Sequence, residues 1–147
     1  MNHFSRRKFL KLMAGSSALL SASELLSGCS KGSSARIVII GGGFGGSTCA
    51  KYLQRFDNSL DITLVEPSTQ FITCPFSNMV INGMRSMDSI SHDYSAQKSR
   101  GVNIVHARAQ VIDTAVRMIA LDNGNTLKYD KLVVSPGIDF KWDEVEG

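Results

Sequence analysis

Four β-branched residues lead directly into a cluster of glycines, an arrangement that few folds accommodate. Residues 37–40 read Ile-Val-Ile-Ile, and the glycines after them fit the pattern Gly41-x-Gly43-x-x-Gly46. A continuous apolar run is typical of a parallel strand buried on both faces. In this pattern the first glycine makes a tight turn, the second lets a pyrophosphate approach the backbone, and the third lets a helix pack close to the strand. The helix N-terminus then offers unpaired N–H groups to the phosphates.

The residues around this pattern indicate a dinucleotide-binding site. Cys49, Leu53 and Phe56 recur at helical spacing and predict an apolar helix face after the glycines. A second strand, residues 61–66, ends in an acid 20 residues after the last glycine, about where such an acid binds a ribose hydroxyl. The alternative is a glycine-rich turn ahead of an ordinary surface glutamate. The predicted nucleotide-binding residues are Gly41, Gly43, Phe44, Gly46 and Glu66.

The N-terminal 29 residues resemble a twin-arginine export signal. Arg6 and Arg7 precede hydrophobic residues, and the apolar stretch at residues 12–26 is too short and too polar to span a bilayer. Such a signal predicts export to the periplasm by a route that carries folded, cofactor-loaded proteins. The alternative is a basic surface helix that remains part of the protein.

The end of this segment is similar to a bacterial lipobox. Residues 26–29 read Leu-Ser-Gly-Cys, which makes Cys29 a candidate for lipidation, with simple signal cleavage as the alternative. Residues 30–34 then form a short flexible linker. A lipid on Cys29 is the only membrane attachment that we expect.

The basic charge of the sequence belongs to the export signal. The chain has 16 Lys and Arg against 13 Asp and Glu, but residues 1–34 hold five of the former and one of the latter. Residues 35–147 therefore carry a formal net charge of −1. Neither a basic stripe nor an aromatic platform is present, so we expect no nucleic-acid partner.

After the second strand the sequence predicts further α/β elements and then an antiparallel meander. A strong hairpin signal, Asn123-Gly124, lies inside the meander. The expected elements are a loop (67–75), a short helix within 76–84 ended by Gly83, a polar helix (91–100) stopped by Gly101, a third parallel strand (102–106), meander strands (111–113, 116–121 and 126–129), and a buried return strand (131–135).

Two further segments contain candidates for nucleotide contact. Ser135, the last residue of the return strand, and Gly137, two residues later, are candidates to line the phosphate side of the site. The backbone near Val111 is a candidate to contact adenine. The alternative for residues 135–137 is a plain turn, because Pro-Gly needs no ligand.

Several segments together resemble the flavoprotein subunits of flavocytochrome c sulfide dehydrogenases. The resemblance covers almost everything from residue 36 to residue 147. The most particular segment is Thr-Cys-Pro-Phe-Ser-Asn at residues 73–78. The others are the glycine pattern, Val-Glu-Pro at 65–67, Gly83, and Val-Val-Ser-Pro-Gly at 133–137.

This resemblance implies FAD as the cofactor, sulfide as the substrate and a c-type cytochrome subunit as the partner that accepts electrons. It assigns Cys74 to a thioether with the 8α-methyl of the flavin, and a thiolate is a suitable nucleophile for such a bond. The alternatives for Cys74 are an inert loop thiol or a disulfide with Cys49. The implied fold is the Rossmann-like FAD-binding half of a flavoprotein with two dinucleotide-binding domains.

The sequence also departs from this family. Its members carry a redox disulfide over the flavin, and neither cysteine occurs in the matching region, so we assign no catalytic residue. His92 and His106 lack a nucleophile partner or metal-ligand spacing and are expected to be structural. We expect residues 35–147 to be the N-terminal part of an FAD-binding domain. The alternatives are a sulfide–quinone or NADH-type disulfide reductase, and an inactive truncated remnant.

Overall fold

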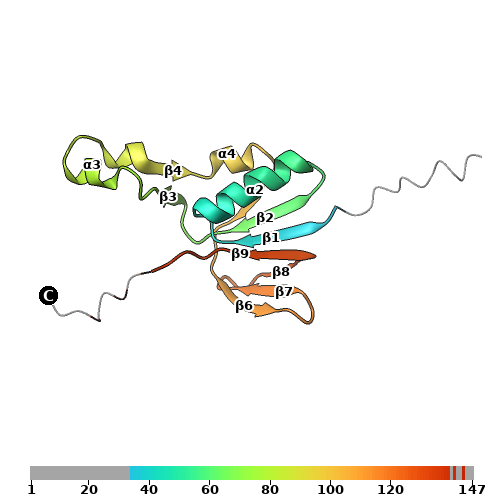
Figure 1. The fold of residues 1–147 in the computed structure, drawn as a ribbon. Helices are drawn as coiled ribbons and strands as arrows, with labels where there is room; N and C mark the ends of the chain where they lie inside the picture. The colour runs from blue at the N-terminus through green and yellow to red at the C-terminus, as the bar shows by residue number, and fades with distance from the viewer. Residues whose placement is uncertain (1–33, 140, 142–143, 145–147) are drawn as a thin grey trace, which may run out of the picture. The chain divides into compact units, whose positions relative to one another are not determined.

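The computed structural model describes residues 34–139, 141 and 144, and a four-stranded parallel sheet lies at its centre (Figure 1). Ile39 and Leu64 pair across the two central strands and are fully buried, as expected for β-branched and leucine runs covered on both faces. The parallel pairing confirms the strands predicted near residues 36–40, 61–66 and 102–106. The strand order is β5 (Asn103–Val105), β2 (Asp61–Val65), β1 (Arg36–Ile40) and β9 (Lys131–Val134).

The return strand β9 pairs with β1, as the sequence predicts, but it is less buried than expected. Its register places Lys131 opposite Ile37 and Val134 opposite Ile40. β9 has one parallel neighbour, β1, so its residues are half-buried or exposed, and Val134 is 58% exposed. The prediction that this return strand is buried is therefore wrong.

Helix α2 (Phe44–Phe56) covers one face of the sheet. Gly46 and Ala50 are its buried residues, and the half-buried Cys49 and Leu53 pack against the same apolar cluster as Ile39 and Leu64. The prediction that Phe56 belongs to this face is wrong, because it is the last helical residue and 83% exposed. Its ring lies 6.3 Å from that of the exposed Tyr52.

Residues 70–93, called the arm below, form a two-stranded ribbon with a short helix beyond it (Figure 1). Its elements are β3 (Gln70–Ile72), α3 (Ser77–Ile81), the 3₁₀ helix η1 (Met87–Ile90) and β4 (Ser91–Asp93). The short helix ended by Gly83 is confirmed, and Gly83 has a positive φ of 72°.

Two expectations in this part of the chain are corrected. The loop expected at residues 67–75 contains β3, and the polar helix expected at residues 91–100 is mostly not helical. Residues 91–93 pair with β3 instead, and only α4 (Ser95–Lys98) is helical. The pairing with β3 takes residues 91–93 out of the expected helix, and the Asp93 carboxylate accepts hydrogen bonds from the N–H and the Oγ of Ser95 at the turn between the strand and α4.

The antiparallel meander covers the other face of the parallel sheet (Figure 1). Val38 and Val65 of the parallel sheet pack there against Ile119 and Leu121 of the meander. The hairpin predicted at Asn123-Gly124 is confirmed. The meander strands are β6 (Ala109–Asp113), β7 (Met118–Leu121) and β8 (Thr126–Lys128).

The parallel sheet is thus packed between α2 and the meander, which is the α/β, Rossmann-like architecture that the sequence predicts. Within the residues that the structure describes, no helix has the length and apolar character needed to cross a bilayer. The predicted export signal (1–29), lipidation at Cys29 and residues 30–33 of the linker lie outside the described residues.

Candidate dinucleotide-binding site

The glycine turn, residues 41–46, runs from the end of β1 into the first turn of α2 at the carboxyl end of the sheet. Gly41 has a φ of +100°, and its N–H donates to the Val65 carbonyl at 2.9 Å. A Cβ on Gly41 would overlap the Ser135 carbonyl, and one on Gly46 would overlap the Gly41 carbonyl. Packing inside the protein therefore requires glycine at both positions.

Gly43 differs from the other glycines of the turn. A Cβ there would meet no atom closer than Cε2 of Phe71 at 3.7 Å, so the protein itself does not exclude a side chain. Gly43 is also the N-cap of α2, which has neither a side-chain cap nor an acidic residue in its first turn. The helix N–H groups and the positive end of the dipole are thus available to an anion that approaches Gly43.

Glu66 comes to the glycine turn from the end of β2. Its Oε2 accepts the N–H of Gly42 at 2.7 Å, and its Oε1 accepts the N–H of Ser68 at 2.9 Å. A carboxylate can accept about four hydrogen bonds, so further donors can bind. The proximity expected from the spacing of 20 residues is present, and the bond to a ribose hydroxyl stays a prediction.

Two hollows open at this turn. One of about 440 Å³ lies between the ends of β1 and β2, residues 107–109 and residues 136–139. The other, of about 600 Å³, lies beside the start of α2. Glu66 and Gly137 line both, whereas Gly41 lines the first, and Gly43, Phe44 and Ser135 line the second. The structure therefore brings most predicted nucleotide-binding residues together.

Phe44 is exposed on the first turn of α2 and faces the second hollow. Its ring contacts that of Phe71 of β3 edge to face, with centroids 5.0 Å apart and an interplanar angle of 82°. This pair connects the start of α2 to the arm. The sequence placed Phe71 in an irregular loop and gave no signal for the contact.

Val111 is not among the residues that line these hollows. It is exposed on β6, whereas Ala107, Arg108 and Ala109, just before and at the start of β6, line the first hollow. The backbone of Arg108 is fixed by Asp122, because its N–H donates to Asp122 Oδ1 at 2.9 Å. Contact between the Val111 backbone and adenine stays a prediction.

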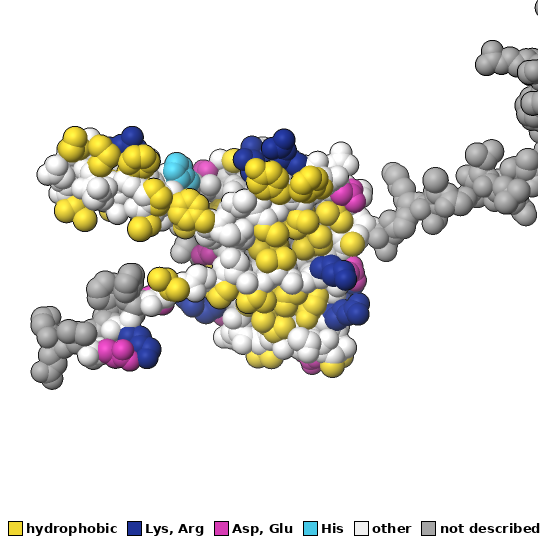
Figure 2. Space-filling model, in the orientation of Figure 1, with side chains coloured by type: hydrophobic (Ala, Val, Ile, Leu, Met, Phe, Trp, Pro, Cys, Tyr) yellow, Lys and Arg dark blue, Asp and Glu magenta, His cyan; other side chains and the backbone are white. Residues whose placement is uncertain are grey.

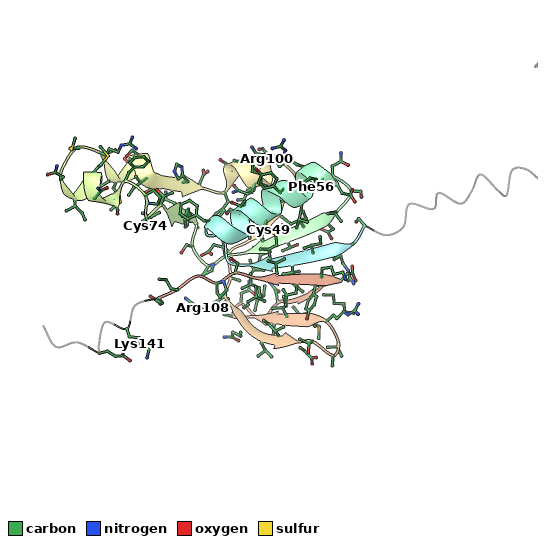
Figure 3. All side chains as sticks on the ribbon, in the orientation of Figure 1. Cys49, Phe56, Cys74, Arg100, Arg108 and Lys141 are labelled. Carbon is green, nitrogen blue, oxygen red and sulfur yellow. The ribbon has the colours of Figure 1, made fainter. Side chains whose placement is uncertain are left out.

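Cys74 is an exposed, free thiol on the arm, whereas the free thiol of Cys49 is half-buried on α2 (Figure 3). No disulfide joins them, which removes one alternative for Cys74. The Cys74 carbonyl accepts the N–H of Ser77 at 3.1 Å. The neighbouring Thr73 lines a third hollow of about 330 Å³, together with Phe44 and Phe71. Attachment of flavin to Cys74 stays a prediction.

Tyr94 is a site residue that the sequence analysis missed. It lies between β4 and α4, is 3% exposed, and its hydroxyl donates to the Gly42 carbonyl at 3.3 Å. Burial, together with the nearby charge of Glu66, raises the pKa of Tyr94 to about 12, so the hydroxyl stays protonated at neutral pH. A tyrosine in a polar segment gives no periodic signal of this position.

The two histidines within the described residues have surroundings that suit a structural role. His106 Nδ1 lies 3.2 Å from the Glu66 carbonyl and 3.1 Å from the Ser68 carbonyl, so this nitrogen is a donor to backbone oxygens. His92 is an exposed residue of β4, opposite Phe71, and not at a helix start. Among the described residues no group of three His, Cys, Asp or Glu side chains is placed to hold a metal ion.

Comparison with known proteins identifies the family. Residues 35–144 match the pyridine nucleotide-disulphide oxidoreductase family, and the chain belongs to it. The structure is similar to the sulfide:quinone oxidoreductase from the hyperthermophilic bacterium Aquifex aeolicus, with a TM-score of 0.70 and 25% identity over 74% of this chain and 26% of that chain.

Two proteins are similar to this chain in amino-acid sequence. The flavoprotein chain of a sulfide dehydrogenase (flavocytochrome c) from Chlorobaculum thiosulfatiphilum is 62% identical over 45 residues, which is 31% of this chain and 94% of that sequence. A mitochondrial sulfide:quinone oxidoreductase from Dictyostelium discoideum is 34% identical over 113 residues, 76% of this chain and 25% of that protein. The chain thus spans about a quarter of the length of the sulfide:quinone oxidoreductases that it matches.

Proposed function

We propose that the chain forms the ADP-binding part of an FAD site in a sulfide-oxidising flavoprotein. The observation that carries this proposal is Gly43, whose open side adjoins the uncapped start of α2 and a hollow lined by Glu66. Close approach of a pyrophosphate accounts for a glycine that the packing of the protein does not require. Glu66, held by Gly42 and Ser68, binds the ribose.

Sulfide is the proposed substrate, because the names of all three similar proteins described above contain sulfide. A c-type cytochrome is the proposed electron acceptor, since the relative that is 62% identical is the flavoprotein chain of a flavocytochrome c. The flavin, when bound, supplies the electron-carrying chemistry. The residues of this chain bind and orient it.

Cys74 is the proposed covalent attachment point for the flavin. A C–S bond to the 8α carbon would replace the thiol S–H bond and one methyl C–H bond, and the two electrons released would reduce the flavin itself. Its thiol is exposed on the arm and next to Thr73, which lines a hollow shared with Phe44 at the start of α2. A thiol so placed is accessible to a cofactor whose phosphates lie at Gly43.

Mass spectrometry of the protein translated from the full reading frame, produced with FAD, tests the cofactor and its attachment. Trypsin cleaves after Arg55 and Arg85, so Cys74 is the single cysteine of the peptide 56–85. This peptide is expected to carry the added mass of the flavin, and Cys74→Ser to lose it while still binding FAD. An unmodified peptide from a yellow protein would refute covalent attachment, and a colourless folded protein would refute the FAD site.

A quinone acceptor is the second candidate, favoured by the 34% identity to a sulfide:quinone oxidoreductase over 76% of the chain. Sulfide-dependent reduction of a c-type cytochrome and of a soluble quinone, measured side by side on the same purified protein, separates the two. We expect faster turnover with the cytochrome. Faster turnover with the quinone would assign the protein to the second candidate.

Export by the twin-arginine route to the periplasm is proposed from the sequence of residues 1–29. Replacing Arg6 and Arg7 together with Lys is expected to retain the protein in the cytoplasm, as measured by cell fractionation. Metabolic labelling with a fatty acid tests lipidation, which Cys29→Ala is expected to abolish. Unchanged export of the double Lys variant would contradict the proposed route.

A further inference from the structure

Three side chains from three different segments hold the peptide groups of Gly42, the second residue of the glycine turn. Its N–H donates to Glu66 Oε2 at 2.7 Å. Its carbonyl accepts Ser47 Oγ of α2 at 2.6 Å and the Tyr94 hydroxyl at 3.3 Å. Gly42 is buried, so both of its polar groups are satisfied within the protein and neither is left for a ligand.

Tyr94 also limits the position of Gly42 by contact. A Cβ on Gly42 would lie 2.5 Å from the Tyr94 hydroxyl and 2.8 Å from Cγ of Glu66, so no side chain fits between these two residues. Tyr94 is nearly fully buried and belongs to the apolar cluster that supports β1 and α2. A side chain that is packed on this cluster has few alternative rotamers, which makes it a rigid support for the turn.

The Glu66 carboxylate is oriented through this contact. Oε2 is bound by Gly42 and Oε1 by Ser68, so the plane of the carboxylate follows the position of two backbone N–H groups. Moving the Gly42 peptide would rotate the carboxylate and turn its remaining acceptor positions away from the hollows. Preorganised groups of this kind increase affinity because less order has to be imposed on binding.

We propose that Tyr94 and Ser47 are positioning residues for the nucleotide, which fix the Gly42 peptide so that Glu66 is held in the orientation that binds the ribose. Neither residue needs to touch the ribose, because both act through Gly42. The inference rests on the FAD site proposed above.

A double-mutant cycle of Tyr94→Phe and Glu66→Gln, in the protein from the full reading frame, tests this positioning role. All variants carry Cys74→Ser, so that FAD binds without a covalent bond, can be removed, and can be titrated by quenching of its fluorescence. In the Glu66 background, Tyr94→Phe is expected to weaken FAD binding about three- to tenfold, the range of one neutral hydrogen bond. In the Glu66→Gln background, the same change is expected to cost less than about twofold, because the carboxylate that Gly42 orients is absent.

Two controls separate positioning from packing. Tyr129→Phe alters a tyrosine that is also buried, in the other apolar cluster, and it is expected to leave FAD affinity unchanged. Ser47→Ala removes the second donor to the Gly42 carbonyl and is expected to repeat the pattern of Tyr94→Phe. If thermal melting shows that Tyr94→Phe does not fold, the Ser47→Ala cycle decides.

An equal loss of affinity in both backgrounds, or no loss in either, would overturn the inference and leave the FAD site standing. If the variant that carries Cys74→Ser alone does not bind FAD, the FAD site itself is refuted. The two failures are therefore distinguishable in one set of titrations.

Discussion

The glycine turn and the arm are both regions where the sequence predicts cofactor contact, and they are built in opposite ways. In the turn, Gly41, Gly42 and Gly46 are all buried, and a Cβ on any of them would lie within 3 Å of another residue. In the arm, α3 has no buried residue, and apolar side chains lie on the surface (Figure 2), namely Ile72, Phe76, Ile81, Met84 and Met87. The chain itself thus determines the nucleotide end of the site far more tightly than the end that carries Cys74.

Phe76 shows how the arm keeps its shape with little burial. It has a φ of +68°, an uncommon conformation for an aromatic residue, and precedes the first residue of α3. The guanidinium carbon of Arg85 lies 4.2 Å from the centre of its ring, within the range of a cation–π contact. Around Phe76 the arm is held by local contacts of this kind, whereas the glycine turn is held by core packing.

The largest expected difference in stability between the two regions comes from replacing one glycine of positive φ in each with alanine. Gly41→Ala combines a φ of +100° with overlap onto the Ser135 carbonyl, and is expected to lower the free energy of unfolding by about 2–5 kcal/mol. Gly83→Ala in the arm has a φ of +72° but no atom within 4 Å, so about 1–2 kcal/mol is expected. Urea unfolding of both variants measures the difference, and equal costs would contradict the contrast.

Neutralising one carboxylate in each region separates binding from folding. Glu66→Gln removes the charge at the hollows and is expected to weaken FAD binding about tenfold or more, given the strength of hydrogen bonds to charged groups. Asp88→Asn alters an exposed acid of η1 in the arm that lines none of the three hollows, and it is expected to change FAD affinity less than twofold. Fluorescence titration in the Cys74→Ser background measures both, and similar losses would contradict the assignment of Glu66.

The pair of Arg36 and Asp130, at the end of the sheet opposite the glycine turn, is expected to make the free energy of unfolding depend on pH in acid. The guanidinium and backbone N–H of Arg36, at the start of β1, bind Asp130, just before β9, and lower the pKa of Asp130 from 3.8 to about 2. Because the folded-state pKa is depressed, this stabilisation is present above pH 4 and is lost as the pH falls through about 2. Asp130→Asn should therefore flatten the dependence of unfolding free energy on pH between about 4 and 2. An unchanged slope in urea titrations at these pH values would contradict it.

The smallest effect is expected on the arm surface. Ile81 is 88% exposed, and Ile81→Ser should change the free energy of unfolding by less than about 0.5 kcal/mol. Ile39→Val in the fully buried core of the sheet is the control, with an expected cost of about 0.5–1.5 kcal/mol. If Ile81→Ser lowers the free energy of unfolding by more than Ile39→Val does, other residues cover this surface in the full protein.

The sequence predicted correctly the regions that have a regular hydrophobic pattern or a clear turn signal. The predictions failed where tertiary contacts determine the local structure. The β-branched runs, the glycine pattern and Asn123-Gly124 gave the sheet, the turn and the hairpin, because local physics and fold agree there. Ser91 to Asp93 became a strand because β3 is available to pair with it, which no local signal reveals. Glu66 was found by its spacing, whereas Tyr94 depends on a contact with Gly42 from 52 residues away.

The pairing of β9 with β1 sets when the nucleotide site can exist. Arg36 and Asp130 are 94 residues apart, and Ser135 packs against Gly41 only after β9 has joined the sheet. During synthesis, β1 and α2 leave the ribosome long before the residues that complete the turn, and non-local pairing of this kind is slow. Cofactor capture is therefore expected only once β9 has joined the sheet, and ribosome-bound chains shorter than about 137 residues are expected to lack it.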